Sequence, residues 1–183
     1  MSEKNIIIMR HFETFEDSNG NEKINYNKSL DKSENFINFI KEYIEKNNNI
    51  NKIRFYTSKH ERTIISALIM CNKLKSNIIS NKLSPIDIYD PIITDLIDRD
   101  PNKKKYKNNC NKIKNEVEAK FKSDTLYIFV THSSTIYNLF ECFCKLYSSK
   151  YNEKFINKIH SYSLSFLTKK KNNLIFDFNI NMR

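Results

Sequence analysis

Two short apolar runs in this chain end in a histidine, and they constrain its fold more than any other feature. The run at residues 5–9 leads into Arg10 and His11, and the run at 126–131 leads into His132. Short runs rich in β-branched and aromatic residues predict strands that are buried on both faces. Open α/β sheets bind ligands at the carboxyl ends of their strands. We therefore expect the two histidines to meet at one edge of a parallel sheet.

Arginine is scarce in this basic chain, which makes its positions informative. The sequence holds 31 Lys and Arg residues together, but Arg occurs only at Arg10, Arg54, Arg62, Arg99 and Arg183. The planar guanidinium binds phosphate or carboxylate through two parallel hydrogen bonds, which a lysine cannot reproduce. Arg62 opens a helix just after a third predicted strand at 52–57. Arg10 and Arg62 are thus candidate anion ligands, whereas Arg54 lies within that strand and is predicted to be structural.

Three motifs in this order resemble those of the histidine phosphatase superfamily, which has the phosphoglycerate mutase-like fold. Residues 10–14 read Arg-His-Phe-Glu-Thr where the family has Arg-His-Gly-Glu followed by Thr or Ser. Residues 58–67 read Ser-Lys-His-Glu-Arg-Thr-Ile-Ile-Ser-Ala, which is similar to the family's second block. Residues 130–133 read Val-Thr-His-Ser where the family ends a strand with His-Gly. The resemblance spans nearly the whole chain.

The resemblance implies a phosphatase that hydrolyses a phosphomonoester through a phosphohistidine intermediate. His11 would be the nucleophile, and Arg10, Arg62 and His132 would neutralise the phosphoryl oxygens, with His132 counted among the catalytic residues. The reaction would need neither a metal ion nor another cofactor, because the arginines supply the positive charge. The partner would be an anionic phosphorylated substrate, either a small molecule or a phosphoprotein.

The family places its proton donor in a Leu-x-Glu pattern after its third strand. Here residues 93–95, Ile-Thr-Asp, match that pattern best and make Asp95 the candidate acid. Asp98, Asp100 and Glu13 are the rival carboxylates. Glu13 could also orient an arginine or a histidine of the site.

Two positions depart from the family pattern. Phe12 and Ser133 each stand where the family has glycine, a residue that permits positive φ or a close backbone approach. Phe12 could narrow the pocket, form an apolar wall, or indicate lost activity. The Ser133 hydroxyl could still donate to phosphate. His60, which lies in the second motif, is predicted to be an exposed residue at a helix start.

Three other functions stay open at this stage. A catalytically impaired relative that binds a phosphorylated ligand would account for Phe12 and Ser133. A phosphoglycerate mutase-type phosphotransferase is disfavoured, since 183 residues leave little room for the extra segments of mutases. A nucleic-acid-binding protein is suggested only by the net charge of +10, and its lysines are spread along the chain among acids.

Composition and length predict one domain over residues 1–183. The single glycine, Gly20, excludes a glycine-rich phosphate loop. No apolar stretch is long enough for a membrane span, and no signal peptide is visible, so a cytoplasmic location is expected. The cysteines lack zinc-site spacing and are predicted to be free thiols in a reducing compartment; they are Cys71, Cys110, Cys142 and Cys144. The sequence makes no prediction of the oligomeric state.

The periodicity of apolar residues predicts an α/β fold, a three-layer α/β/α sandwich with a mostly parallel central sheet and a C-terminal antiparallel hairpin at one edge. A polar loop is expected over 12–30, and a capping-box pattern predicts that a helix starts near Asp31. The predicted strands are 4–10, 52–57, 86–89 and 126–131, with a terminal hairpin of 161–168 and 174–180. The other predicted helices start near 58 and 103 and after 132.

Overall fold

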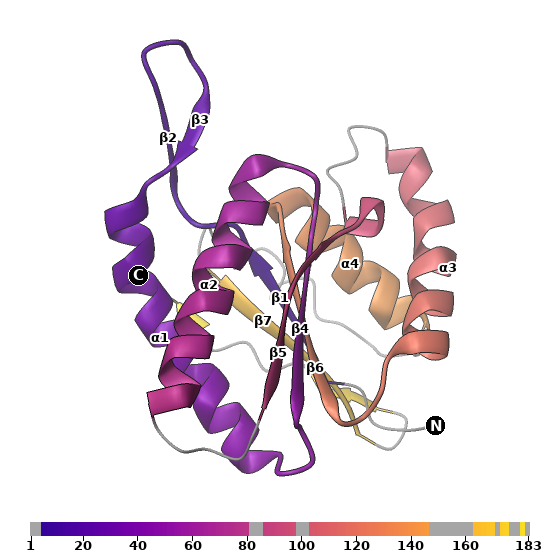
Figure 1. Ribbon diagram of the computed structural model, residues 1–183. Helices are drawn as coiled ribbons and strands as arrows, with labels where there is room; N and C mark the ends of the chain where they lie inside the picture. Colours follow the sequence, from indigo (N-terminus) through magenta and orange to yellow (C-terminus); the bar gives the residue numbers. More distant parts are fainter. Residues whose placement is uncertain are drawn as a thin grey trace.

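The computed structural model describes residues 5–80, 86–97, 103–146, 163–170, 173–175 and 180–181. Four strands form the parallel centre of the sheet in the order β5 (Asp87–Ile93), β4 (Lys52–Thr57), β6 (Thr125–Thr131) and β1 (Asn5–Arg10). β7 (Ser163–Lys170) continues the sheet antiparallel to β1, and β8 (Asn173–Ile175) and β9 (Ile180–Asn181) pair with β7. The predicted fold class, a mostly parallel α/β sheet with an antiparallel hairpin at one edge, is confirmed (Figure 1).

Helices cover both faces of this sheet. α1 (Tyr26–Lys46) and α2 (Glu61–Ser80) pack together on one face, and α3 (Lys103–Lys120) and α4 (Ser133–Leu146) pack together on the other (Figure 1). Successive residues of β1 point to opposite faces, as the pleat of a strand requires. Ile7 and Met9 therefore join the cluster with α1 and α2, while Ile6 and Ile8 join the cluster with α3 and α4. Among the described helices, none is long and apolar enough to span a membrane.

The segment expected to be a loop contains a second, small sheet. β2 (Thr14–Glu16) and β3 (Glu22–Ile24) form an antiparallel hairpin that extends away from the main sheet (Figure 1). The turn forms because the Asp17 carboxylate accepts hydrogen bonds from the backbone N–H groups of Asn19 and Asn21. Gly20 adopts φ 75°, a conformation that a side chain would strain.

The predicted start of the first helix is wrong by one and a half turns. α1 begins at Tyr26, and the side chain of Asn25 caps it by accepting a hydrogen bond from the N–H of Lys28. Within the expected capping box, the Ser33 hydroxyl instead donates to the carbonyl of Leu30. Asparagine is as good an N-cap as serine or aspartate, so the local signal at Asp31 did not decide the boundary.

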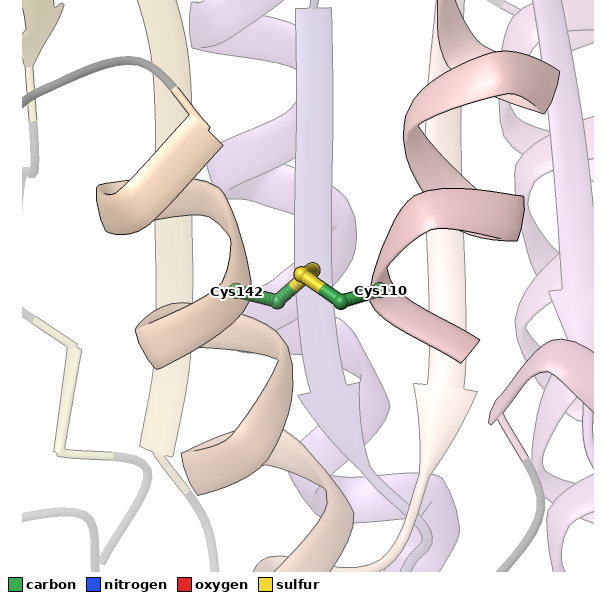
Figure 2. The surroundings of a disulfide bond; sticks show 2 residues. All are labelled: Cys110 and Cys142. Carbon is green, nitrogen blue, oxygen red and sulfur yellow. A yellow bond between two sulfur atoms is a disulfide. The ribbon is translucent and has the colours of Figure 1, made fainter. Parts of the chain in front are cut away.

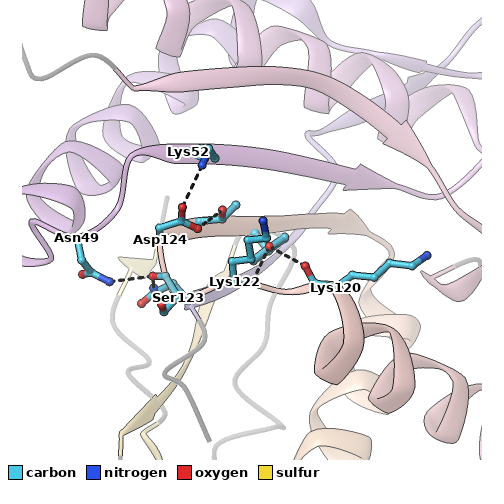
Figure 3. A network of polar contacts seen from close by, with 9 residues as sticks. Asn49, Lys52, Lys120, Lys122, Ser123 and Asp124 are labelled. Atoms are coloured by element: carbon cyan, nitrogen blue, oxygen red, sulfur yellow. Dashed lines mark hydrogen bonds and ion pairs between the residues drawn. The ribbon is translucent and has the colours of Figure 1, made fainter.

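The amino ends of the parallel strands are held by polar contacts that serve the fold. Lys52 Nζ lies 3.0 Å from Asp124 Oδ2, and Asn49 donates to the carbonyl of Ser123 (Figure 3). The backbone N–H of Lys122, in the segment that leads into β6, donates to the Tyr127 hydroxyl. These contacts hold the amino ends of the strands in place, at the opposite end of the sheet from the carboxyl ends.

A disulfide overturns the expectation that the cysteines are all free thiols. Cys110 on α3 and Cys142 on α4 are bonded, with Cα atoms 5.5 Å apart, and the bond crosses between the two helices (Figure 2). Spacing in the sequence could not reveal the pair, because its closeness depends on how α3 packs against α4. Cys71 is free and buried.

Reduction of the disulfide is expected to destabilise the protein by about 3–4 kcal/mol, because the bond closes a loop over 32 residues of sequence separation. Urea unfolding with and without reductant measures this difference. Cys110→Ser should lose the same amount and become insensitive to reductant, whereas Cys71→Ser should keep the reductant effect. Equal stability of the oxidised and reduced protein would contradict the bond.

Candidate functional site

The carboxyl ends of β1, β4 and β6 lie side by side and bring the sequence-predicted residues together. Arg10 pairs in register with Thr131, and the N–H of His11 donates to the carbonyl of Thr131 at 2.9 Å. His132 follows Thr131 directly, so its imidazole lies next to that of His11. The two ring centroids are 5.3 Å apart. The two histidines therefore lie next to each other at the carboxyl ends of the strands, as the sequence predicts.

His11 is buried, and one of its ring nitrogens is fixed. The residue is only 5% exposed, and its Nδ1 lies 2.7 Å from the carbonyl oxygen of Phe12. A carbonyl can only accept, so Nδ1 carries the proton and Nε2 keeps its lone pair. Burial lowers the pKa of His11 from 6.5 to about 4; the carbonyl of Phe12 opposes this shift, and the charges of Arg10 and Arg62 add to it. At neutral pH the ring is therefore uncharged and nucleophilic at Nε2.

Hydrogen bonds on both ring nitrogens orient His132. Arg62 Nε donates to Nδ1 at 3.4 Å, so Nε2 carries the proton and donates to Ser58 Oγ at 3.1 Å. Ser58 is buried and contacts the Thr63 hydroxyl at 2.8 Å. Thr63 in turn donates to the carbonyl of His60 at 2.7 Å. This chain runs from β6 through the β4–α2 connection and fixes the ring before any ligand binds.

Both arginines of the predicted anion site reach this edge. Arg10 Nε is buried and has no hydrogen-bond partner among the described residues. Buried polar groups in proteins are nearly always paired, so an unpaired guanidinium donor fits an anion-binding site. Arg62, whose side chain is only 15% exposed, forms an ion pair between its Nη1 and the Glu22 carboxylate on β3. Its guanidinium thus faces His132 through Nε and the hairpin through Nη1.

The residues that replace the family glycines differ in their surroundings. Phe12 is 2% exposed and belongs to the hydrophobic cluster that includes Ile24 and Phe36. Its N–H donates to Ser66 Oγ at 2.9 Å, which ties the turn after β1 to α2. The ring is therefore a core side chain packed below the turn. Ser133 is exposed and is the first residue of α4.

Of the four predicted carboxylates, Asp95 and Glu13 lie within the described residues. Asp95 is exposed in the short 3-10 helix η1 (Asp95–Ile97). That helix is fixed to the carboxyl edge because Thr131 Oγ1 donates to the carbonyl of Ile97 at 2.6 Å. Glu13 forms a partly exposed ion pair with Lys28 at 3.4 Å. The rivals Asp98 and Asp100 lie outside the described residues.

Three functional neighbours were missed by the sequence interpretation. His60, expected to be an exposed helix-start residue, packs its ring edge-on against His132 with centroids 4.7 Å apart. Ser58 is a hydrogen-bond partner of His132, and Glu22 is the partner of Arg62. The second block of the motif contains Ser58 and His60, so strand-end position could have identified them. No local signal marks Glu22, because its contact depends on the hairpin.

Comparisons with known proteins support the fold. No protein-family model matches the sequence, and no curated protein sequence matches it. Among solved structures, a protein assigned as the phosphohistidine phosphatase SixA of Agrobacterium tumefaciens has a TM-score of 0.54 at 12% identity, covering 97% of both chains. Mycobacterial hydrolase 2 has a TM-score of 0.56 at 8% identity, covering 98% of this chain and 91% of the other. At such identities the likeness concerns the fold alone. In its strand order and layers, and over nearly its whole length, the chain shares the α/β fold of these two structures.

Proposed function

We propose that this protein is a phosphatase that hydrolyses phosphomonoesters through a phosphohistidine on His11. The observation that carries the proposal is the state of His11 itself. Its Nδ1 is bonded to the carbonyl of Phe12, its pKa is lowered to about 4, and it lies beside two arginines and a second histidine. A buried, neutral imidazole with one free nitrogen is an activated nucleophile.

The reaction has two displacement steps at phosphorus. First, the lone pair on His11 Nε2 forms a P–N bond while the P–O bond to the leaving group breaks. The leaving oxygen takes up a proton and departs as an alcohol. Then a water molecule attacks the phosphohistidine and gives its proton to the carboxylate that donated in the first step, the P–N bond breaks, and inorganic phosphate leaves. In both steps the guanidinium groups of Arg10 and Arg62 would stabilise the charge on the phosphoryl oxygens, and the Nε2–H of His132 would do so by exchanging Ser58 Oγ for a phosphoryl oxygen as acceptor.

Asp95 is our candidate for the proton donor to the leaving oxygen. Its support is position: η1 follows β5, and the N–H of Thr94 donates to the carbonyl of Thr57 at the end of β4. That bond keeps Asp95 at the edge where His11 lies. Its exposure lets it exchange protons with water between turnovers.

Hydrolysis is favoured over the impaired-relative alternative by the placement of Phe12. A phenylalanine in the position of a family glycine would argue against catalysis if it filled the phosphate site. Its ring is instead buried with Ile24 and Phe36. The substrate would be an anionic phosphorylated molecule, and the absence of a metal or cofactor requirement remains part of this proposal.

His11→Ala is expected to lower kcat/KM for p-nitrophenyl phosphate by roughly a thousandfold or more, as removal of a nucleophile does. Labelled phosphate should attach to the wild-type protein as an acid-labile adduct and not to the variant. Circular dichroism and urea unfolding check that the variant is folded. Activity within tenfold of wild type would refute the phosphohistidine mechanism.

Arg62→Lys is expected to raise the Ki of inorganic phosphate by about 10- to 100-fold, since a lysine cannot bond His132 and two phosphate oxygens together. Arg54→Lys is the matched control, because Arg54 lies within the sheet with its Cζ 4.4 Å from the centroid of the Tyr89 ring. The control should leave the Ki unchanged. Similar effects of the two variants would show that Arg62 has no special role.

The protonation of His11 is expected to occur near pH 4, well below the value of 6.5 for a free imidazole. NMR titration of the ring resonances, assigned with His11→Ala, measures this directly. Between pH 6.5 and pH 4 the unfolded chain binds a proton at this site that the folded chain does not. The free energy of unfolding should therefore decrease as the pH is lowered from 6.5 to 4, and it should decrease less in His11→Ala. A midpoint near 6.5 would contradict the buried, neutral nucleophile.

A further inference from the structure

A cavity of about 640 Å³ is lined in part by Arg62, the residue that donates to His132 in the candidate site. Its walls come from the β2–β3 hairpin, the start of α1 and the first turns of α2. The hairpin projects from the carboxyl edge of the sheet above the beginnings of these two helices (Figure 1). This volume falls within the range of sites that bind small organic molecules and exceeds what a phosphate ion needs.

Arg62 belongs both to the cavity lining and to the proposed phosphate site, which places the two next to each other. Arg62 Nε reaches His132, while the same side chain lines the cavity and pairs with Glu22. A phosphoryl group held by Arg62 would therefore have its ester substituent directed toward the hairpin. No separate ligand is required to account for the cavity.

The described lining offers apolar contact. Phe15 and Tyr26 are 50% and 54% exposed, and Ile24 and Ile65 lie beside them in the cavity wall. Large aromatic side chains that stay half exposed beside a cavity supply flat apolar surface for a ligand. Phe15 lies opposite Lys23 in the hairpin, so these two side chains share a face, and both residues line the cavity.

The charges of the same lining are already paired. Arg62 pairs with Glu22, and Lys23 lies 3.8 Å from Glu61. Among the described lining residues, each cation thus has a carboxylate partner, and the four charges sum to zero. A second anionic group on the substrate, such as a carboxylate or another phosphate, would meet two carboxylates and no unpaired cation.

We infer that this cavity binds the organic substituent of a phosphorylated ligand and selects ligands with an uncharged, apolar or aromatic body over those that carry a second anionic group. The inference rests on the proposed function in one respect: the phosphoryl group must sit at Arg10 and Arg62. Phe15 is then a specificity-determining residue. Phosphatase action fits this selection better than mutase action, because a bisphosphorylated intermediate carries the second anion that the cavity disfavours.

Binding of phosphonates tests the selection without requiring turnover, since the C–P bond is not hydrolysed. By titration calorimetry, 1-naphthylphosphonate should bind about tenfold or more tightly than methylphosphonate. Phe15→Ala should remove most of that advantage and leave methylphosphonate affinity unchanged. Leu68→Ala is the control, because Leu68 is also exposed on α2 but is not part of the described lining.

The charge argument has its own pair of ligands. Phenylphosphonate should bind about three- to tenfold more tightly than 4-carboxyphenylphosphonate at low salt. Glu61→Gln frees Lys23 from its partner and should narrow this ratio, while Glu16→Gln, an exposed carboxylate on the same hairpin, should not.

The outcomes separate the two proposals. Turnover of p-nitrophenyl phosphate with equal affinity for naphthyl and methyl phosphonates would overturn the inference alone. A clear naphthyl preference that Phe15→Ala abolishes, without any turnover, would support the inference and overturn the hydrolase. Tighter binding of 4-carboxyphenylphosphonate, or failure of every phosphonate to bind, would also overturn the inference.

Discussion

The parallel register of β1 against β6 is the constraint on which the candidate site depends. Arg10 lies opposite Thr131, and the N–H of His11 extends the ladder by one more hydrogen bond to the Thr131 carbonyl. A slip of one residue would turn the side chains of β1 to the opposite faces of the sheet. Both hydrophobic clusters would then be disrupted, since β1 contributes to each. The core thus holds the two histidines at contact distance.

Burial gives the site its chemical state. An imidazole in water titrates near neutrality, and His11 is kept neutral by loss of solvent and by two nearby arginines. The same arginines that disfavour a positive His11 would attract the negative phosphoryl group. In the proposed mechanism, an uncharged nucleophile beside cations would serve both binding and attack. Because Arg62 is also paired with Glu22, a phosphorylated substrate at this residue would compete with a carboxylate of the protein itself.

The sequence was sufficient for features that depend on local pattern. The buried runs ending at Arg10, His11 and His132 predicted their strands and their common edge, since an apolar run fixes both burial and end point. Contacts that depend on tertiary packing were not predictable in this way. The turn holds hairpin signals at Asp17 and Gly20, but no local pattern shows that the hairpin packs against α2, so Glu22 was not connected with Arg62. The disulfide required knowledge that α3 and α4 are neighbours, which cysteine spacing does not contain.

The position of Phe12 has a consequence for the motion of the residue before it. His11 is held by a backbone bond to Thr131 on one side, and Phe12 is held on the other by Ser66 and by the hydrophobic core. The imidazole ring of His11 also donates a hydrogen bond from Nδ1 to the Phe12 carbonyl. Its rotamer freedom is therefore lost when the chain folds and not when a ligand arrives. A reactive atom that is already immobile meets its target with little further loss of entropy, which is the condition for an efficient intramolecular-like attack.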